Sequence, residues 1–161
     1  MNNSEHEQRQ RLKPIVAMVQ EQKFEQAVSL LKEYLLEFPQ NEVALGMLAS
    51  TYQQLGMSGD ARDNFRKILS FNEENALARF QLGMTYFQEK NWSQALAEWQ
   101  SLIESGTEYA SLFYGAMCHL NMGDQESAVK YFKMSAKLMP KSHPLYGSLQ
   151  DIASKLNFSL S

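Results

Sequence analysis

The residues best suited to chemistry are a cysteine and a histidine that stand side by side, Cys118 and His119. A thiol beside an imidazole is the residue pair of a cysteine nucleophile and its general base. Adjacent residues on a helix, however, point about 100° apart and do not face each other. His119 also stands where two other segments carry a tyrosine, Tyr52 and Tyr86, which is typical of a packing position. We therefore interpret both residues as packing residues.

The remaining titratable residues do not form a second constellation. His6 lies near the start of the chain and His143 close to its last predicted helix, so neither is placed for a site with the other. Glu73 and Glu74 lie in a predicted loop and are typical of a solvated surface. No nucleotide-binding glycine loop, nucleophile elbow or metal-binding helix motif occurs. The expectation is a protein without enzymatic activity, catalytic residues, cofactor or metal ion.

Composition narrows the class of protein and its partners. The length of 161 residues suits one domain with its own core, and a hydrophobic fraction of 44% is ordinary for a globular protein. The formal net charge is -3 and the basic residues are dispersed, so nucleic acid is not an expected partner. Cys118 is the only cysteine, which excludes an internal disulfide.

The opening residues and the hydropathy pattern bear on location. The polar start of the chain lacks the apolar core of a secretory signal. No apolar run approaches the roughly 18 residues needed to span a bilayer. The default expectation is a cytoplasmic protein without a membrane span.

A repeated sequence pattern predicts the helices that position these residues. Alanines recur at intervals of 34, 34 and 33 residues, and a large apolar residue stands four positions after each. The alanines are Ala27, Ala61, Ala95 and Ala128, and the large residues are Leu31, Phe65, Trp99 and Phe132. Twelve positions before three of the alanines stand the small residues Ala49, Gly83 and Ala116. Each unit predicts two amphipathic helices joined by a turn, so the chain is expected to be almost wholly helical.

The small residues have a packing role. Two helices approach closely only where small side chains meet, so the alanines are expected at the crossing point within each helix pair. The large residues are expected to fill the space between one pair and the next. A single pair cannot bury its apolar face, so successive pairs must stack to form a stable core.

This pattern resembles the tetratricopeptide repeat, a 34-residue helix–turn–helix unit with the motif Leu-Gly-x2-Tyr, then Ala-x3-Phe, then Pro. The best match is "LGMTY" at 82–86 with "ALAEW" at 95–99, followed by "LASTY" at 48–52 with "ARDNF" at 61–65. "GAMCH" at 115–119 with "AVKYF" at 128–132 is weaker in its first helix. The resemblance implies an all-α, right-handed superhelical solenoid with three good repeats, a degenerate N-terminal repeat and a C-terminal capping helix.

The expected organisation is one structural domain over residues 12–158. Its parts are a flexible polar tail at 1–11, the degenerate repeat at 12–41, repeats at 42–75, 76–108 and 109–142, and the capping helix at 143–158. The first helix is expected to be short and to begin near Pro14, because a proline deep inside a helix costs about 3 kcal/mol. Pro144 fits the first turn of the capping helix.

The resemblance also implies that the first helices of the repeats line a concave surface on which ligands commonly bind. The residues expected to face this groove are Met47, Ser50, Gln53, Phe80, Met84, Phe87, Phe113, Met117 and Leu120. Methionine suits surfaces that adapt to several sequences, so the expected partner is an apolar or amphipathic segment of a protein or peptide. Plain packing, or occupation by the chain's own tail or by a second copy, remain alternatives.

A better-known binding mode of the family is not expected. Certain tetratricopeptide domains clamp the terminal carboxylate of a peptide with Lys, Asn and Arg on consecutive first helices. The matching positions here, Leu12, Val16, Ser50, Phe80 and Met84, offer no cation. The leading interpretation is a non-enzymatic adaptor or scaffold. The alternatives are a small dedicated chaperone, similar to those of type III secretion, and a self-assembling homo-oligomer.

Overall fold

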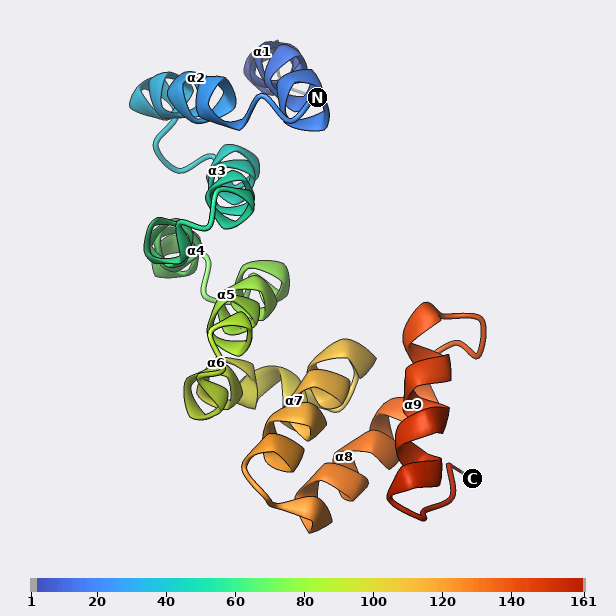
Figure 1. Cartoon of the computed structure of the whole chain (residues 1–161). Helices are drawn as coiled ribbons and strands as arrows, with labels where there is room; N and C mark the ends of the chain where they lie inside the picture. Colours follow the sequence, from blue (N-terminus) through green and yellow to red (C-terminus); the bar gives the residue numbers. More distant parts are fainter. Residues whose placement is uncertain (1–2, 161) are drawn as a thin grey trace. The chain divides into compact units, whose positions relative to one another are not determined.

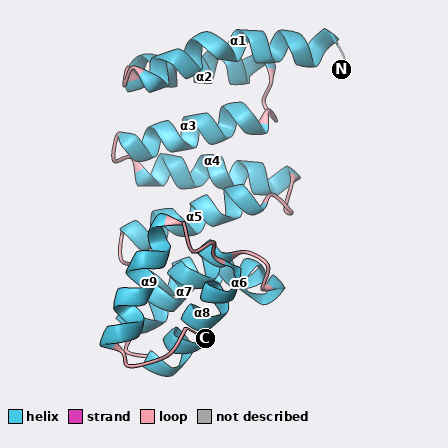
Figure 2. Ribbon diagram, turned by 90° about the vertical axis from the view of Figure 1, so that its right-hand side faces the viewer, coloured by secondary structure: helices cyan, strands magenta, loops and turns pink. Residues whose placement is uncertain are grey.

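The computed structural model describes residues 3–160, which form nine α-helices joined by short loops (Figure 1). The helices are α1 (Asn3–Gln20), α2 (Phe24–Glu37), α3 (Glu42–Gln54), α4 (Ser58–Phe71), α5 (Ala76–Gln88), α6 (Trp92–Ser105), α7 (Tyr109–Asn121), α8 (Gln125–Leu138) and α9 (Pro144–Lys155). Figure 2 shows only helices and loops over this range. The prediction of an all-α chain built from helix pairs is confirmed.

The helices form two compact units, one ending at Thr85 and the other beginning at Tyr86, so the division falls inside α5. In the N-terminal unit, α2 packs against α1 and α3, and α3 packs against α4. In the C-terminal unit, α7 packs against α6 and α8, and α8 packs against α9. The sequence predicts one domain over residues 12–158 and does not indicate this division, because the repeat pattern continues through α5.

The small residues of the repeat lie at the centre of the helix pairs. Ala27, Ala49, Ala61, Ala95, Ala116 and Ala128 are all 0% exposed. The large residues that follow the second-helix alanines are at most 2% exposed: Leu31, Phe65, Trp99 and Phe132. Because an alanine occupies little space, the two helices of a pair approach closely there, and the larger side chains fill the layer beside them. The prediction that these residues are buried is therefore confirmed.

Asparagine side chains cap the N-termini of α3 and α5. Each also forms a hydrogen bond to the first helix of the preceding pair, α1 or α3. The Oδ1 atoms of Asn41 and Asn75 accept a hydrogen bond from the backbone N–H three residues later, at 2.9 and 2.8 Å. This satisfies a donor that a helix N-terminus leaves unpaired. The Nδ2 atom of Asn41 donates to Gln8 on α1, and that of Asn75 donates to Glu42 on α3. One residue thus caps a helix and fixes its neighbour.

The first helix differs from the prediction. It begins at Asn3 and continues through Pro14, so a short helix starting near Pro14 is wrong. Residues 3–11 of the predicted flexible tail belong to this helix, whereas residues 1 and 2 lie outside the described part of the chain. A proline inside a helix removes one backbone hydrogen bond, and this cost must be offset elsewhere.

Contacts between α1 and α2 provide that offset. Leu12 and Ile15 flank the proline and are 5% and 4% exposed. Arg11 donates from both terminal nitrogens to the carboxylate of Glu37, at 2.7 and 2.9 Å. The same hydrogen bond lowers the pKa of Glu37 from its ordinary value. Burial of the apolar stripe, with this bidentate pair beside it, holds the helix together through the proline.

The C-terminal helix α9 covers the last helix pair, as its amphipathic sequence predicts. His143 precedes it and its Nδ1 atom accepts from the Leu145 N–H at 3.2 Å, while Pro144 occupies the first turn. Leu149 is fully buried on the inner face of the helix. The chain then reverses at Asn157, which has a left-handed backbone conformation with φ of 55°.

Candidate functional site

A hollow of about 440 Å³ opens between the first helices of the N-terminal unit. One wall comes from α3, and Leu77 and Ala78 of α5 form the opposite wall. Phe65 and Ile68 of α4 lie beneath them, each 2% exposed. Helices that begin 34 residues apart present equivalent positions side by side, which is why the hollow lies between repeats.

Two exposed apolar residues stand at the rim of this hollow. Val43 is 62% exposed and Leu77 is 69% exposed. They occupy the same place in successive repeats, one position after the first residue of α3 and of α5. Single exposed apolar residues are ordinary on a protein surface. Here the two residues belong to the lining of one apolar hollow.

One residue that lines the hollow is a glycine. Gly46 lines it from the middle of α3, and a Cβ atom built there would meet no atom within 4 Å. The corresponding position one repeat later carries Phe80. At this position the chain therefore carries no side chain in one repeat and an aromatic residue in the next.

The polar groups of the hollow carry little charge. Glu42 is the one ionisable side chain among the described residues that line it. Its carboxylate accepts hydrogen bonds from Asn72 Nδ2 at 2.8 Å and from Asn75 Nδ2 at 2.5 Å. Ser50 and Gln81 add uncharged polar groups. With no lysine or arginine in this lining, the hollow does not suit a carboxylate ligand.

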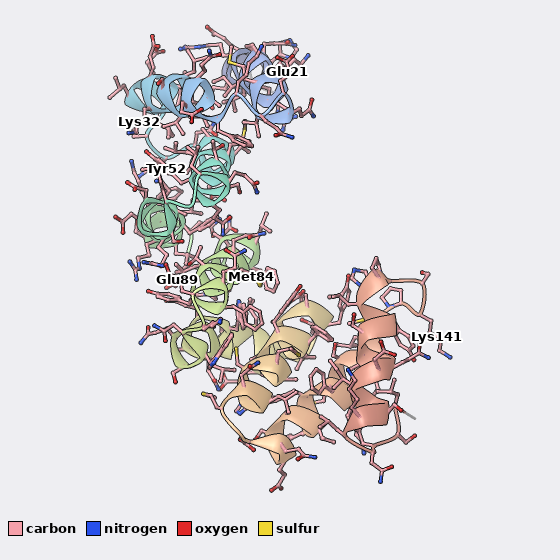
Figure 3. All side chains as sticks on the ribbon, in the orientation of Figure 1. Glu21, Lys32, Tyr52, Met84, Glu89 and Lys141 are labelled. Atoms are coloured by element: carbon pink, nitrogen blue, oxygen red, sulfur yellow. The ribbon has the colours of Figure 1, made fainter. Side chains whose placement is uncertain are left out.

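The sequence-predicted groove residues of the N-terminal unit fall into two sets. Met47 and Ser50 line the hollow. Gln53, Phe80 and Met84 are half-buried but do not belong to its lining (Figure 3 labels Met84 on α5). The register of the repeat thus places two of the five predicted residues in the hollow.

The predicted groove residues of the C-terminal unit lie in other surroundings. Phe87 is half-buried in an aromatic cluster, with its ring centroid 5.1 Å from Trp92 and 5.3 Å from Tyr114. Met117 and Leu120 are partly buried against the core of α7 and α8. Part of the apolar surface of each side chain is therefore buried by packing within the unit.

The expectation that Phe113 faces a groove is corrected by its burial. Phe113 is 4% exposed, and its ring packs edge-on against Phe132 with centroids 5.6 Å apart. It shares a core cluster with Leu149 of α9. The capping helix supplies the layer that buries Phe113, and counting positions along α7 alone does not include that layer.

The chain's own C-terminal segment packs against the same core. The ring of Phe158 stacks on Phe132 with centroids 6.3 Å apart, and Lys133 Nζ lies 5.9 Å from the centroid of Phe158. Leu160 also packs against this cluster. Beside Phe113, the apolar surface of the last repeat is therefore covered by α9 and the residues after it.

Comparison with known proteins decides the family. Two tetratricopeptide-repeat models match the chain, one at residues 43–75 and the other at residues 77–105 and 110–142. This chain is a tetratricopeptide-repeat protein. The matched residues contain the pairs α3–α4, α5–α6 and α7–α8, the three that carry the motif well in the sequence.

Solved structures with a similar fold include crystal structures of MamA. One has a TM-score of 0.73 at 21% identity, over 87% of this chain and 88% of that chain. Another, MamA 41-end from Desulfovibrio magneticus RS-1, has a TM-score of 0.78 at 14% identity, over 93% and 85%. Identities this low show a shared fold. No curated protein sequence matches the chain. Within residues 3–160, none of the helices is both long enough and apolar enough to cross a membrane.

Sequence reasoning missed Val43 and Leu77, the rim of the hollow. The signal was present, because each follows an asparagine-capped helix start by two residues and the two are 34 residues apart. An apolar residue that recurs in the first turn of successive first helices occupies an equivalent place in each repeat, which is a signal that the two form one surface. Val19 of α1 lines the same hollow and was also missed.

The Cys118–His119 pair does not form a catalytic arrangement. Cys118 is fully buried, and burial raises the pKa of its thiol to about 12. The His119 ring has its Nδ1 atom 3.1 Å from Oδ2 of Asp124. Hydrogen bonds from Ser127 hold the pKa of Asp124 below its ordinary value. Among the described residues, no group of three or more His, Cys, Asp and Glu residues is placed to hold a metal ion.

The burial of Cys118 predicts slow thiol chemistry. We expect 5,5′-dithiobis(2-nitrobenzoate) at pH 8 to modify the native protein at least about a hundredfold more slowly than the protein unfolded in urea, because the thiolate is the reactive form. Cys118 is the only cysteine, so the colour change reports this site alone. Rapid and complete modification of the folded protein would show that the first helix of the last repeat opens readily.

Proposed function

We propose that this tetratricopeptide-repeat protein is a non-enzymatic interaction module, an adaptor or scaffold, which binds an apolar or amphipathic segment of a partner protein. The observation that carries the proposal is the hollow between α3 and α5 with its exposed rim, Val43 and Leu77. Membership of the repeat family and the likeness to MamA structures support the broader role of a protein-interaction scaffold.

The rim supplies free energy for such an interaction. Full burial of a valine or leucine side chain is worth about 1.5–3 kcal/mol relative to exposure. The floor of the hollow is already formed and apolar, so a partner pays little to shape it. An amphipathic helix or an extended apolar segment is the kind of ligand that removes such a surface from water.

The charges support an apolar ligand over an acidic one. The lining of the hollow holds the carboxylate of Glu42 and, among its described residues, no lysine or arginine. A peptide whose recognition depends on its terminal carboxylate would meet an anion there and no cation. The partner segment is therefore held by contact with apolar side chains.

The proposal extends the binding surface to the half-buried residues Phe80 and Met84 on α5. We expect the double variant Phe80→Ala with Met84→Ala to weaken partner binding about thirtyfold or more, because truncating one binding hot spot typically costs at least 2 kcal/mol. The measurement is affinity capture from lysate with quantitative mass spectrometry, followed by titration calorimetry with the purified partner.

Leu36→Ala is the matched control, because Leu36 is 84% exposed on α2 and lies outside the hollow. Circular dichroism of all variants separates lost binding from lost folding. A double variant that keeps its helical content and binds the purified partner as tightly as the wild type would exclude Phe80 and Met84 from the binding surface.

A further inference from the structure

We infer that the hollow over Gly46 is an anchor pocket, which takes one bulky, uncharged apolar side chain from a partner segment without acidic residues beside that anchor. The inference rests on the proposed function and names the chemistry that the partner must present. Partner segments that lack such an anchor are thereby excluded.

The size of the pocket leaves room for a bulky side chain. Its volume of about 440 Å³ lies within the roughly 300–1,000 Å³ typical of small-ligand sites. Gly46 has open space around its Cβ position, and Phe80 fills the corresponding position one repeat later. The fold therefore accommodates a large side chain at this place in a repeat, and in this repeat the chain does not supply one.

The walls suit an apolar group of variable shape. Phe65 and Ile68 of the floor and Ala78 of one wall are at most 3% exposed, so the core already holds them in place. Met47 stands beside Gly46 with a flexible, polarizable side chain, which adapts to aliphatic and aromatic groups alike. A rigid floor with one adaptable wall selects for apolar character and size.

The charge at the mouth of the pocket selects the residues that flank the anchor. Glu42 lies at one end, and its two carboxylate oxygens accept hydrogen bonds from Asn72 and Asn75. These bonds hold the carboxylate in place, so it cannot turn away from an approaching ligand. An acidic neighbour of the anchor is repelled, whereas an uncharged or basic neighbour is accepted.

The exposed rim determines where the segment runs. Val43 and Leu77 lie on opposite walls of the hollow, and both are more than half exposed. A segment that covers both residues crosses the hollow, which Gly46 also lines. The anchor then enters the pocket while its neighbours cover the rim, which is the arrangement of a binding hot spot.

The test uses the full chain and a phage-displayed library of random dodecapeptides selected on the wild-type protein. Selected peptides are synthesised with a fluorophore, and their affinities are measured by fluorescence anisotropy for the wild type, Gly46→Leu, Gly46→Ala and Gly147→Leu. We expect the peptides to share one bulky apolar residue without acidic neighbours and to bind Gly46→Leu about tenfold more weakly or worse. Gly46→Ala has an intermediate effect, because its methyl group fills less of the pocket.

Gly147→Leu is the matched control, because Gly147 is also a helix glycine with open space at its Cβ position but lies on α9, outside the pocket. Both leucine variants remove a glycine from a helix, so both are expected to raise the melting temperature by about 2–4 °C. Weaker peptide binding by a more stable protein cannot result from unfolding. Gly147→Leu is expected to bind the peptides as the wild type does.

Three results overturn the inference and differ in what they leave standing. If the peptides bind the Phe80→Ala, Met84→Ala variant more weakly but bind Gly46→Leu as tightly as the wild type, the anchor pocket is excluded and the proposed function stands. A library that yields no binder of the wild type overturns both. A wild-type dimer in light scattering that becomes a monomer in Gly46→Leu shows that a second copy of the chain is the occupant.

Discussion

We expect Trp99→Ala to lower the free energy of unfolding of the C-terminal unit by about 3–5 kcal/mol. Trp99 is 0% exposed, and its ring centroid lies 6.0 Å from that of Phe87 and 6.1 Å from that of Tyr114. The substitution removes a large apolar surface and leaves a cavity among rings that α5, α6 and α7 hold in place. Small domains are stable by only about 5–15 kcal/mol, so the loss is a large share of the total.

The measurement is urea unfolding followed by circular dichroism at 222 nm, which does not depend on tryptophan fluorescence. Trp92→Ala is the matched control, because Trp92 is half-buried and touches the same Phe87 ring at a centroid distance of 5.1 Å. We expect it to cost about 1–2 kcal/mol, since its ring is only partly removed from water. A loss below about 1 kcal/mol for Trp99→Ala would show that the large residue of the repeat does not hold successive helix pairs together.

The repeat could be predicted because its signal is local and periodic. Ala95 and Trp99 stand on one face of a helix, and their spacing alone indicates that both lie in a buried layer. The same pattern repeated along the chain identified the helix pairs and the family. Such predictions succeed because equivalent residues of successive repeats pack against equivalent neighbours.

The errors arose where a residue depends on a different part of the chain. Pro14 lies inside a helix whose apolar stripe is buried and whose Arg11 pairs with Glu37, 26 positions later, and the local sequence indicates neither contact. Phe113 is buried because α9 covers it, although the same position in the preceding repeat, Phe80, is half-buried. Periodicity predicts which residues of a repeat pack against other helices. It does not show which segment of the chain covers the first or the last repeat.

The candidate site was predicted only in part for a related reason. The register of the family points to the middle of the first helices, and of the residues predicted there in the N-terminal unit, Met47 and Ser50 line the hollow. The exposed rim residues stand in the first turn of each helix, where sequence patterns mainly predict capping. Their exposure depends on the distance between neighbouring first helices, and only the three-dimensional structure shows that distance.

The rim residues give the largest expected effect on binding. We expect Val43→Asp with Leu77→Asp to weaken partner binding about a thousandfold, because each removes an apolar contact worth about 2 kcal/mol and every 1.4 kcal/mol is tenfold in affinity. Aspartate has no long apolar stem with which to cover the hollow, unlike lysine. An aspartate carboxylate must also lose its water when an apolar segment covers it, so the loss is greatest for ligands with apolar anchors.

Folding should survive this double change. Both side chains are more than half exposed, and surface substitutions usually alter stability by no more than about 0.5 kcal/mol. Acidic residues in the first turn of a helix also interact favourably with the helix dipole. Leu36→Asp is the control, since it adds one aspartate, as each of the two rim substitutions does, at a leucine that is 84% exposed and outside the hollow. Titration calorimetry with the purified partner should show wild-type affinity for Leu36→Asp and no measurable heat for the rim variant. If both variants lose affinity equally, net charge rather than the hollow governs binding.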